Sequence, residues 1–444
     1  MIKSEKTLRE DTAMAENTDI KLRNKIIYSV FVRNHTVEGT FRAVIPDLDR
    51  IKALGADYIW LMPIHPIGKG KRKGTLGSPY ANMDYRTVNP EYGTLEDFKT
   101  LVDEIHRRGM KVMIDVVYNH TSPDSVLWNT HPEFFYKKPD GHPGNHVGEW
   151  TDIIDLDYTV PALWDYQIES LCYWAGFVDG FRCDVASFVP VEFWLRAREA
   201  VAKVNPDCVW LAETVHREFG DYCRRSGMYS GTDTEMFAAF DMEYEYDTRQ
   251  AFDDYIDGKT NLGHWLDLLS FQDCVYPANY NKLRFLENHD LRRIASVTDS
   301  ESDLKNFTAM LYFEKGATLI YAGQEAENDH QPTLFDKDTI SWDTGKDLSP
   351  LMVRLAEIKK KYLSPQDSFI AQGDNKKDIA VMLRQTDIRR KIGVFSLRSR
   401  KGWVSVEAPD GEYRNLIDDK TVIVENGRLY CGGEPVIIAF DVKQ

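Results

Sequence analysis

The segment DGFRCDVAS, residues 179–187, is the stretch from which we interpret the rest of the chain. In it, Arg182 and Asp184 alternate with three apolar residues, Phe181, Cys183 and Val185. A period of two is typical of a β-strand, so Arg182 and Asp184 are expected on the same side of it. Most such pairs are structural ion pairs. A guanidinium that orients a carboxylate and keeps it ionised also suits a nucleophile, and the rest of the sequence must decide between the two.

Similar apolar runs recur along the chain, and most are followed by a stretch with helical character. We expect strands at 26–33, 58–64, 111–118, 180–186, 209–215, 237–242, 283–287 and 317–322. Helices are expected at 41–54, 95–108, 162–177, 191–204 and 352–362. Strand–helix units in this number predict an α/β fold, the (β/α)₈ TIM barrel. A doubly wound open sheet is the alternative, but no Gly-rich phosphate loop follows the first strand.

Changes in composition and in apolar periodicity divide the chain into four parts. Residues 1–24 are polar and are expected to be a disordered or loosely attached lead-in. The barrel occupies 25–118 and 158–364, and a short inserted domain rich in Pro, Gly and His occupies 119–157. From 365 to 444, short alternating runs separated by turns predict a C-terminal antiparallel β-sandwich.

Composition narrows the function classes. The net charge of −15 argues against nucleic acid or an anionic membrane as a partner. No run of about 18 apolar residues suggests a membrane span, and the first residues lack the apolar core of a signal peptide. The six cysteines show no CxxC spacing, which is typical of free thiols in a reducing compartment. We therefore expect a cytoplasmic protein, and the sequence leaves its oligomeric state open.

Most of the candidate catalytic and binding residues lie at the predicted strand ends. In a TIM barrel, polar residues at the C-terminal ends of the strands face a common site. Six such residues lie at or just after the ends of the third, fourth, fifth and seventh strands: His120, Arg182, Asp184, Glu213, His289 and Asp290. Tyr80 and Asp84 follow the second strand. Carboxylates, histidines and an arginine on one rim indicate a catalytic site rather than ordinary surface.

Four short segments on this rim resemble, in the same order, the four motifs of the α-amylase family of glycoside hydrolases (family 13), here most like a small bacterial intracellular α-amylase. They are DVVYNH (115–120), GFRCDVA (180–186), LAETV (211–215) and FLENHD (285–290). SPYANMDY (78–85) and GQE (323–325) are similar to further features of the family. The resemblance extends from about Ile26 to the end of the chain.

The resemblance implies catalytic roles for three carboxylates. Asp184 would attack the anomeric carbon and form a covalent glycosyl-enzyme, and Glu213 would act as general acid and then base, as in the retaining mechanism. Asp290 would bind ring hydroxyls of the distorted sugar. The same sugar would meet four substrate-binding residues, Tyr80, His120, Arg182 and His289. We expect Asp84 to support its loop, and Asp115 to be structural, near the barrel floor.

The metal site of the family is altered. Many α-amylases bind Ca²⁺ through an Asn, an Asp and a His four residues after the nucleophile. Asn119 and Asp155 match the first two, but Phe188 stands at the His position, where it cannot be a ligand. Ser187 likewise replaces a Lys that often contacts sugar on the leaving-group side. We expect no required cofactor; Ca²⁺, if bound, would sit at Asn119 and Asp155.

The sequence thus predicts a retaining hydrolase that cleaves α-1,4-glucosidic bonds of maltodextrins or starch-derived oligosaccharides. A family transglycosylase or α-glucosidase, including one acting on a phosphorylated disaccharide, is the main alternative, and a non-catalytic carbohydrate-binding protein is another. The segment IIDLDY (153–158) differs from the QPDLN-like segment of oligo-1,6-glucosidase-like relatives, which favours 1,4-linkages. The basic stretch 69–73, beside Tyr80, is either a solvated loop or a site for a sugar phosphate.

Overall fold

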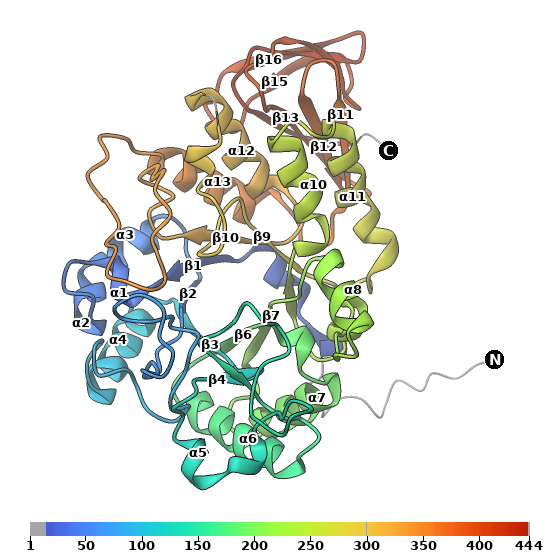
Figure 1. Cartoon of the computed structure of the whole chain (residues 1–444). Coiled ribbons are helices and arrows are strands. Elements are labelled where there is room, and N and C mark those ends of the chain that lie inside the picture. Colours follow the sequence, from blue (N-terminus) through green and yellow to red (C-terminus); the bar gives the residue numbers. More distant parts are fainter. Residues whose placement is uncertain (1–14, 299, 443–444) are drawn as a thin grey trace.

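The computed structural model describes residues 15–298 and 300–442, and a closed barrel lies at its centre (Figure 1). Parallel strands form the barrel in the ring order β1-β10-β9-β8-β7-β6-β3-β2. Their bounds are Ile26–Val30 (β1), Tyr58–Leu61 (β2), Lys111–Val116 (β3), Gly180–Cys183 (β6), Val209–Ala212 (β7), Met242–Tyr244 (β8), Lys282–Arg284 (β9) and Ala317–Tyr321 (β10). The predicted TIM barrel is confirmed, and the strands other than β8 lie close to their predicted positions.

The prediction for the sixth barrel strand was wrong. It was expected at 237–242, but β8 is Met242–Tyr244. The residues before it form the short helix α9, Asp233–Met236, because Thr232 and Glu235 satisfy each other's backbone N–H groups in a capping box. Phe237 then caps this helix instead of entering a strand. Local capping therefore outweighed the apolar pattern of this segment.

Helices cover the outer face of the barrel (Figure 1). The helices of the barrel region are Val32–His35 (α1), Phe41–Val44 (α2), Leu48–Ala53 (α3), Leu95–Arg107 (α4), Pro161–Ala175 (α6), Val191–Ala202 (α7), Arg217–Arg225 (α8), Tyr246–Ile256 (α10), Leu262–Val275 (α11), Glu301–Phe313 (α12) and Ser349–Tyr362 (α13). The helix predicted at 41–54 is divided by the 3₁₀ turn Ile45–Asp47, where Pro46 has no N–H to continue the helical ladder. Across the described residues, none of the helices combines the length and the apolar character that crossing a bilayer requires.

The N-terminal lead-in is attached to the barrel wherever the structure describes it. Residues 1–14 of the predicted lead-in lie outside the described part, and residues 15–24 form two 3₁₀ turns, Ala15–Asn17 and Ile20–Asn24. Arg23 is buried and donates hydrogen bonds to the backbone oxygens of Tyr280 (2.7 Å), Ala278 (2.8 Å) and Pro365 (2.9 Å). The expectation of loose attachment is therefore wrong for residues 15–24, because a buried guanidinium satisfies three carbonyl groups there.

The segment between β3 and α6 is an irregular insertion with little regular structure. Its elements are His120–Thr121 (β4), Leu127–Thr130 (α5), the 3₁₀ turn Pro132–Phe134 and Ile154–Asp155 (β5). β4 and β5 pair antiparallel, with His120 opposite Asp155. This short ladder holds both ends of the insertion beside the C-terminal ends of the barrel strands.

Two antiparallel sheets follow the barrel and form the upper part of the molecule in Figure 1. Their orders are β11-β12-β13-β18 and β14-β17-β16-β15. The strands are Ser368–Asp374 (β11), Ile379–Gln385 (β12), Arg389–Ser396 (β13), Gly402–Ser405 (β14), Gly411–Arg414 (β15), Thr421–Glu425 (β16), Arg428–Cys431 (β17) and Val436–Asp441 (β18). Their inner faces share one apolar core, which includes Ile392, Val404 and Leu429.

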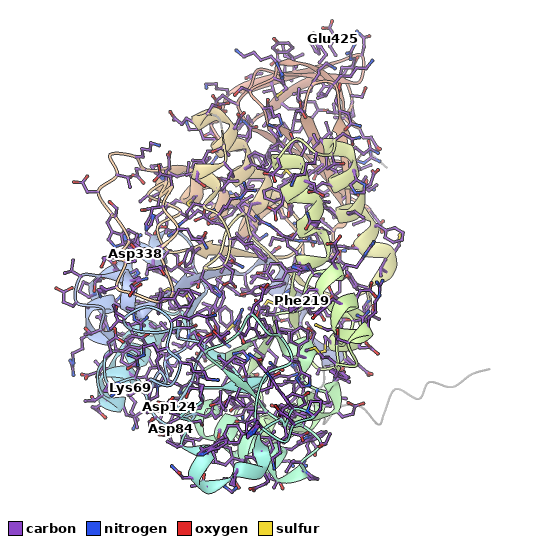
Figure 2. All side chains as sticks on the ribbon, viewed as in Figure 1. Lys69, Asp84, Asp124, Phe219, Asp338 and Glu425 are labelled. Carbon is purple, nitrogen blue, oxygen red and sulfur yellow. The ribbon has the colours of Figure 1, made fainter. Side chains whose placement is uncertain are left out.

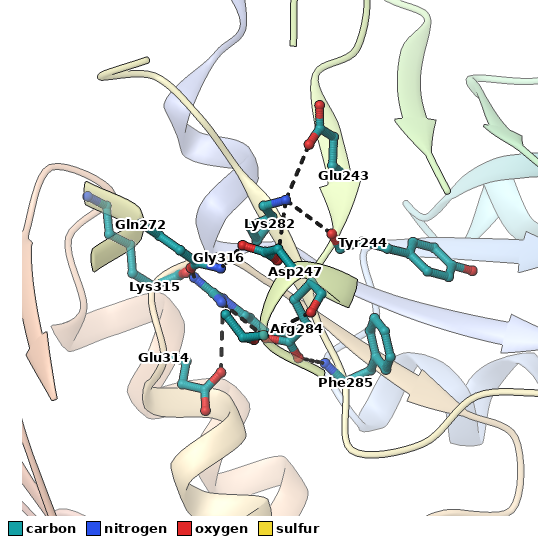
Figure 3. A network of polar contacts seen from close by, with 12 residues as sticks. Glu243, Tyr244, Asp247, Gln272, Lys282, Arg284, Phe285, Glu314, Lys315 and Gly316 are labelled. Atoms are coloured by element: carbon teal, nitrogen blue, oxygen red, sulfur yellow. Dashed lines mark hydrogen bonds and ion pairs between the residues drawn. The ribbon is translucent and has the colours of Figure 1, made fainter. Parts of the chain in front are cut away.

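A buried polar cluster lies on the outer face of the barrel wall, between β8, β9 and the helices that cover them (Figure 3). The Lys282 ammonium forms ion pairs with Asp233, with Glu243 at 3.2 Å and with Asp247 at 3.5 Å. Tyr244, one residue after Glu243, points the other way and packs in the barrel interior. We call these four residues, Asp233, Glu243, Asp247 and Lys282, the outer cluster.

Candidate active site

Arg182 is the centre of the site. It lies on β6 inside the barrel, and its side chain is fully buried. Its Nη1 donates to Asp115 Oδ1 at 2.8 Å and to Asp184 Oδ1 at 3.0 Å, and its Nη2 lies 2.8 Å from Glu213 Oε1. One guanidinium thus holds three carboxylates in place. We call these four residues, Asp115, Arg182, Asp184 and Glu213, the inner cluster.

Aromatic rings surround this guanidinium. The Arg182 Cζ atom lies 5.1 Å from the ring centroid of Trp60, 5.6 Å from that of Tyr80 and 5.2 Å from that of Tyr244. Tyr244 also accepts a hydrogen bond from Arg182 Nε at 3.2 Å. Ring faces attract a cation, so this packing fixes the guanidinium and, through it, the carboxylates.

Backbone geometry aims Asp184 and Glu213 into the same space. Each directly follows its strand and continues the ladder, because Asp184 N–H donates to Val116 O at 2.9 Å and Glu213 N–H donates to Cys183 O at 3.0 Å. Val185 has a left-handed conformation with φ +35°, which is unusual for a β-branched residue. Its N–H donates to Glu213 Oε2 at 2.9 Å. The strained turn therefore directs a backbone donor at the second carboxylate.

The electrostatics of the inner cluster differ from expectation. Arg182 was expected to hold Asp184 ionised, but burial and then the neighbouring Glu213 raise the pKa of Asp184 well above its usual value. Burial also raises the pKa of Glu213, against the lowering effect of Arg182. One buried cation cannot offset three buried carboxylates, so the cluster retains a proton at a pH where isolated carboxylates have lost theirs.

Tyr80, His289 and Asp290 form a connected group beside these carboxylates. The Tyr80 hydroxyl lies 2.7 Å from His289 Nε2 and donates to Asp115 Oδ2 at 3.1 Å, while the Tyr80 and His289 rings stack at 5.3 Å. His289 Nε2 also lies 3.1 Å from Asp290 Oδ2. Burial alone would raise the pKa of Asp290, but its charge and hydrogen-bond contact with His289 lower it. Asp290 is therefore the carboxylate of the rim with the strongest tendency to stay ionised.

His120 completes the predicted set. Its Nε2 lies 3.9 Å from Asp184 Oδ2, and its other ring nitrogen lies 3.2 Å from the Asn119 amide nitrogen. Burial lowers the pKa of His120, which keeps its imidazole neutral near pH 7. A neutral imidazole can donate one hydrogen bond into the site without adding charge.

A cavity of about 520 Å³ opens over this group. The predicted residues that line it are Tyr80, His120, Asp184, Glu213, His289 and Asp290. Arg182, predicted to bind substrate, lies behind this surface and is reached only through the carboxylates. The structure thus brings the predicted residues together, with Arg182 in a supporting position.

The structure adds contacts and lining residues to the predicted site. Asp115, expected to be structural and near the barrel floor, is fully buried, pairs in register with Arg182 and bonds to it and to Tyr80. Its place in DVVYNH, on the inward face of β3, was a signal that could have been used. Of the lining residues outside the predicted set, Phe219, labelled in Figure 2, lies on α8, and Trp150 comes from the inserted segment.

The loop after β2 is held by hydrogen bonds within the loop and to neighbouring loops. Within the basic stretch 69–73, Lys73 lines the cavity, whereas Lys69 uses its backbone N–H to bind Asp124 Oδ2 at 2.8 Å (Figure 2). Arg72 donates to backbone oxygens of Gly68, Thr75 and Ile67. Asp84 accepts from the Arg86 N–H at 2.9 Å and from the Thr87 hydroxyl at 3.0 Å, so it supports the loop as expected.

The residues at the expected calcium position have other partners. Both the backbone N–H and the Nδ1 of His146 lie 2.7 Å from Asp155 Oδ2. The Phe188 ring packs against the rings of Trp150 and Phe219. Among the residues that the structure describes, no group of three or more His, Cys, Asp or Glu side chains is placed to hold a metal ion.

Comparison with known proteins gives consistent matches over most of the chain. Residues 12–139 and 148–367 match the model of the alpha amylase catalytic domain, and residues 371–438 match that of the bacterial alpha amylase C-terminal domain. The crystal structure of an alpha-amylase from Lactobacillus plantarum is 45% identical, covers 95% of this chain and 100% of its own, and has a TM-score of 0.91.

Curated relatives are more distant. An intracellular maltogenic amylase from Bacillus subtilis is 25% identical over 410 residues, which are 86% of this chain and 66% of that protein. An alpha-1,4-glucan:maltose-1-phosphate maltosyltransferase from Rhodospirillum rubrum is 36% identical over 200 residues, which are 40% of this chain and 29% of that protein. This chain therefore spans only part of the length of both relatives.

Proposed function

This chain belongs to the α-amylase family of glycoside hydrolases, and from that membership we propose that it is a retaining enzyme acting on α-1,4-glucosidic bonds of maltodextrins or starch-derived oligosaccharides. The observation that carries the proposal is the pair of carboxylates, Asp184 and Glu213, on opposite nitrogens of the Arg182 guanidinium at the base of the cavity. Two carboxyl groups that flank one bond are what glycoside hydrolysis requires.

In this mechanism Asp184 attacks the anomeric carbon and forms a covalent glycosyl-enzyme. Retaining enzymes hold their two carboxyl groups about 5–5.5 Å apart, against about 6.5–9.5 Å in inverting enzymes. A shared guanidinium favours the closer arrangement, since Asp184 Oδ1 and Glu213 Oε1 lie 3.0 Å and 2.8 Å from its two terminal nitrogens. Arg182 acts as a positioning residue here, because it touches the carboxylates and not the cavity.

Glu213 protonates the leaving oxygen and then removes a proton from the attacking water. Burial raises its pKa, which suits a group that must hold a proton near neutral pH. The inner cluster as a whole binds a proton more readily than free carboxyl groups, and Glu213 is the member whose role needs it. Attack on the anomeric carbon requires an ionised Asp184, so the reactive form of this coupled pair is the one in which the proton sits on Glu213.

The remaining residues bind the reacting sugar. Asp290 has a lowered pKa and offers an ionised carboxylate to ring hydroxyls. His289 and the neutral His120 donate hydrogen bonds, and the Tyr80 ring, fixed against His289, forms a flat surface for the sugar. These contacts strengthen as the ring flattens toward the transition state, so they contribute to rate as well as to binding.

We also propose that the enzyme needs no calcium. Ca²⁺ takes six to eight oxygen ligands, and the expected calcium site around Asn119, Asp155 and Phe188 offers few oxygen atoms. Asp155 Oδ2 is occupied by His146, and Phe188 fills the place of the usual His with an aromatic ring. Asp155 Oδ1 is buried without a hydrogen-bond partner, but one free oxygen is too few for this ion. The residues therefore do not fit the metal, and no catalytic step depends on it.

Prolonged chelation tests the calcium proposal. We expect activity and melting temperature to be unchanged after dialysis against a calcium chelator. The variant His146→Ala serves as the matched change, since it removes the imidazole contact to Asp155 Oδ2 without touching the cavity residues. A loss of activity on chelation that Ca²⁺ alone restores would contradict the proposal and would indicate substitute oxygen ligands near Asn119.

We infer a cytoplasmic location and an oligosaccharide as the partner. All six cysteines are free in the structure, which suits a reducing compartment. The relative from Bacillus subtilis carries the description intracellular. Fractionation of the native host, with a cytoplasmic and a secreted marker enzyme, tests the location.

A family transglycosylase is the second candidate, because of the similarity to the maltosyltransferase over 200 residues. Product analysis by mass spectrometry separates the two on maltose, maltoheptaose, isomaltose, trehalose 6-phosphate, maltose 1-phosphate and starch. We expect shorter α-1,4 oligosaccharides from maltoheptaose and starch, and no turnover of isomaltose or the sugar phosphates. Products longer than the substrate would support transfer, and no turnover of any substrate would support a binding protein.

A further inference from the structure

The cavity has two ends that face opposite sides of the barrel. In the ring order of the strands, β7 is opposite β1, while β2 and β10 flank β1. Glu213 follows β7, so the proposed acid stands across the barrel from the loops after β2 and β10. A general acid stands beside the leaving group. The glycone, which is the part of the substrate toward its non-reducing end, therefore extends toward those two loops.

These two loops are joined by backbone hydrogen bonds. The N–H groups of Leu76 and Gly77 both donate to Phe335 O at 3.0 Å. Thr75 donates to Asp336 Oδ1 from its backbone at 2.7 Å and from its hydroxyl at 2.6 Å. A sugar chain cannot pass between loops that are bonded to each other in this way. We call residues 73–77 and 334–336 the end wall.

The end wall is anchored from below and packed closely. The buried Arg33, which follows β1, donates to Gly77 O at 2.9 Å and to Leu334 O at 3.1 Å. Gly74 has φ +62°, and a Cβ there would lie 2.6 Å from the Phe335 Cβ. The two loops approach so closely at this point that only glycine fits. The wall is therefore a built part of the fold rather than a chance loop contact.

Lys73 extends the wall to the inserted segment. Its ammonium lies 3.0 Å from Asp152 Oδ1, donates to Glu149 O at 3.2 Å and lies 5.9 Å from the Phe335 ring centroid. Lys73, Asp152 and Phe335 all line the cavity. Loops after β2, β3 and β10 are thus tied together at the glycone end. The Asp152 carboxylate also offsets the charge that would have attracted a sugar phosphate to Lys73.

We propose that the end wall and the Lys73–Asp152 bridge close the glycone end of the cleft, so that the enzyme removes short units from the non-reducing ends of α-glucans. Lys73 is then a specificity-determining residue. The inference rests on the proposed glycosidase function, and it adds the mode of attack. A glucan whose non-reducing end is blocked does not fit against the wall, and an internal bond far from that end cannot reach Asp184 and Glu213. The open end of the cleft, beside Glu213, accepts the rest of the chain.

The test compares two aryl maltoheptaosides that differ only in a bulky acetal on the non-reducing glucose. We expect the wild-type enzyme to cleave the unblocked substrate at least about tenfold faster, since the blocked end does not fit against the wall. Equal rates on both substrates would overturn the inference while leaving the glycosidase function intact. Failure to cleave either substrate would instead contradict the proposed function.

Variants of the bridge locate the effect. Lys73→Ala should raise the rate on the blocked substrate relative to the unblocked one by about tenfold, because it opens the wall beside Asp152. The matched control is Lys69→Ala, an exposed lysine of the same basic stretch, which should leave the ratio unchanged. The exchange of Lys73→Asp with Asp152→Lys should restore the wild-type ratio. An unchanged ratio in Lys73→Ala would remove Lys73 from the proposal.

Discussion

Two buried cations lie on opposite faces of the same barrel wall, and each faces three carboxylates. Inside the barrel, Arg182 contacts Asp115, Asp184 and Glu213. Outside it, Lys282 contacts the carboxylates of the outer cluster, of which Glu243 and Asp247 are labelled in Figure 3. Tyr244 joins the two clusters, since its hydroxyl accepts from Arg182 and its backbone oxygen accepts from Lys282 at 3.2 Å.

Charge and burial alone do not distinguish the two clusters. Burial raises the pKa of Glu243 in the outer cluster, as it raises that of Glu213 in the inner one. The difference is access: Asp184 and Glu213 line the cavity, and no member of the outer cluster does. A buried ion cluster therefore indicates function only where a substrate can reach it, and otherwise it holds strands and helices together.

The largest expected effect comes from breaking the inner cluster. Asp184→Ala should lower kcat/KM by at least about 10⁴-fold, because the nucleophile is lost. The melting temperature should not fall, since the variant removes one of the carboxylates that crowd Arg182. Turnover assays and thermal unfolding measure the two effects, with Asp84→Ala, outside the cavity, as control. Wild-type turnover in Asp184→Ala would end the catalytic assignment.

Breaking the outer cluster should reverse this pattern. Lys282→Met leaves the outer carboxylates without their cation, and loss of one partner of a buried pair costs about 3–5 kcal/mol of unfolding free energy. The folded fraction should keep its kcat, measured well below the melting temperature. Lys203→Met, which breaks an exposed pair with Glu199, is the control and should cost at most about 1 kcal/mol. A fall in kcat without destabilisation would mean that the outer cluster takes part in catalysis.

Tyr244→Phe tests the link between the clusters. The change removes the hydroxyl that accepts from Arg182 Nε but keeps the backbone oxygen bonded to Lys282. A buried donor left without a partner costs about 1–3 kcal/mol, which should appear in the unfolding free energy and partly in kcat. Tyr430→Phe, at an exposed site, is the control. Unchanged stability and kcat would show that Arg182 is positioned by its carboxylates alone.

The last comparison of stability concerns pH. Burial, and then Glu245, raise the pKa of Glu314 near the outer cluster to about 8. The folded state thus keeps a proton that the unfolded chain releases near pH 4.5. The retained proton of Glu314 therefore contributes fully to stability below pH 4.5, and this contribution is lost as the pH rises to about 8. Glu314→Gln should therefore flatten the decline of melting temperature over this range, whereas the exposed Glu357→Gln should not; a parallel decline in both would exclude this group.

Much of the fold and of the candidate site could be predicted from patterns between residues that are close in the sequence. The alternation of apolar strands and helices predicted the barrel, and the strand ends placed Asp184, Glu213 and Asp290 on one rim. β8 was misplaced because the capping box of Thr232 and Glu235 uses polar side chains that strand periodicity ignores.

What the sequence did not reveal depends on contacts between distant segments. The end wall joins Leu76 to Phe335, and the bridge joins Lys73 to Asp152; no local pattern encodes either pairing. The raised pKa of Asp184 was not foreseen for a related reason. An Arg-x-Asp pair suggests one charge offsetting one charge, whereas the folded chain adds Asp115 and Glu213 to the same guanidinium.

The central claim is that Asp184 forms the covalent intermediate and Glu213 transfers the protons. Glu213→Gln with an activated aryl α-glucoside tests it most directly. Such a leaving group departs without protonation, but the second step lacks its base, so a glycosyl-enzyme should accumulate. Intact-protein mass spectrometry should show one added glycosyl group, and peptide mapping should place it on Asp184. An adduct that maps to Asp290 in this variant would contradict the account, and so would an adduct on Glu213 in a protein that keeps Glu213. Full turnover by Glu213→Gln without any adduct would contradict it as well.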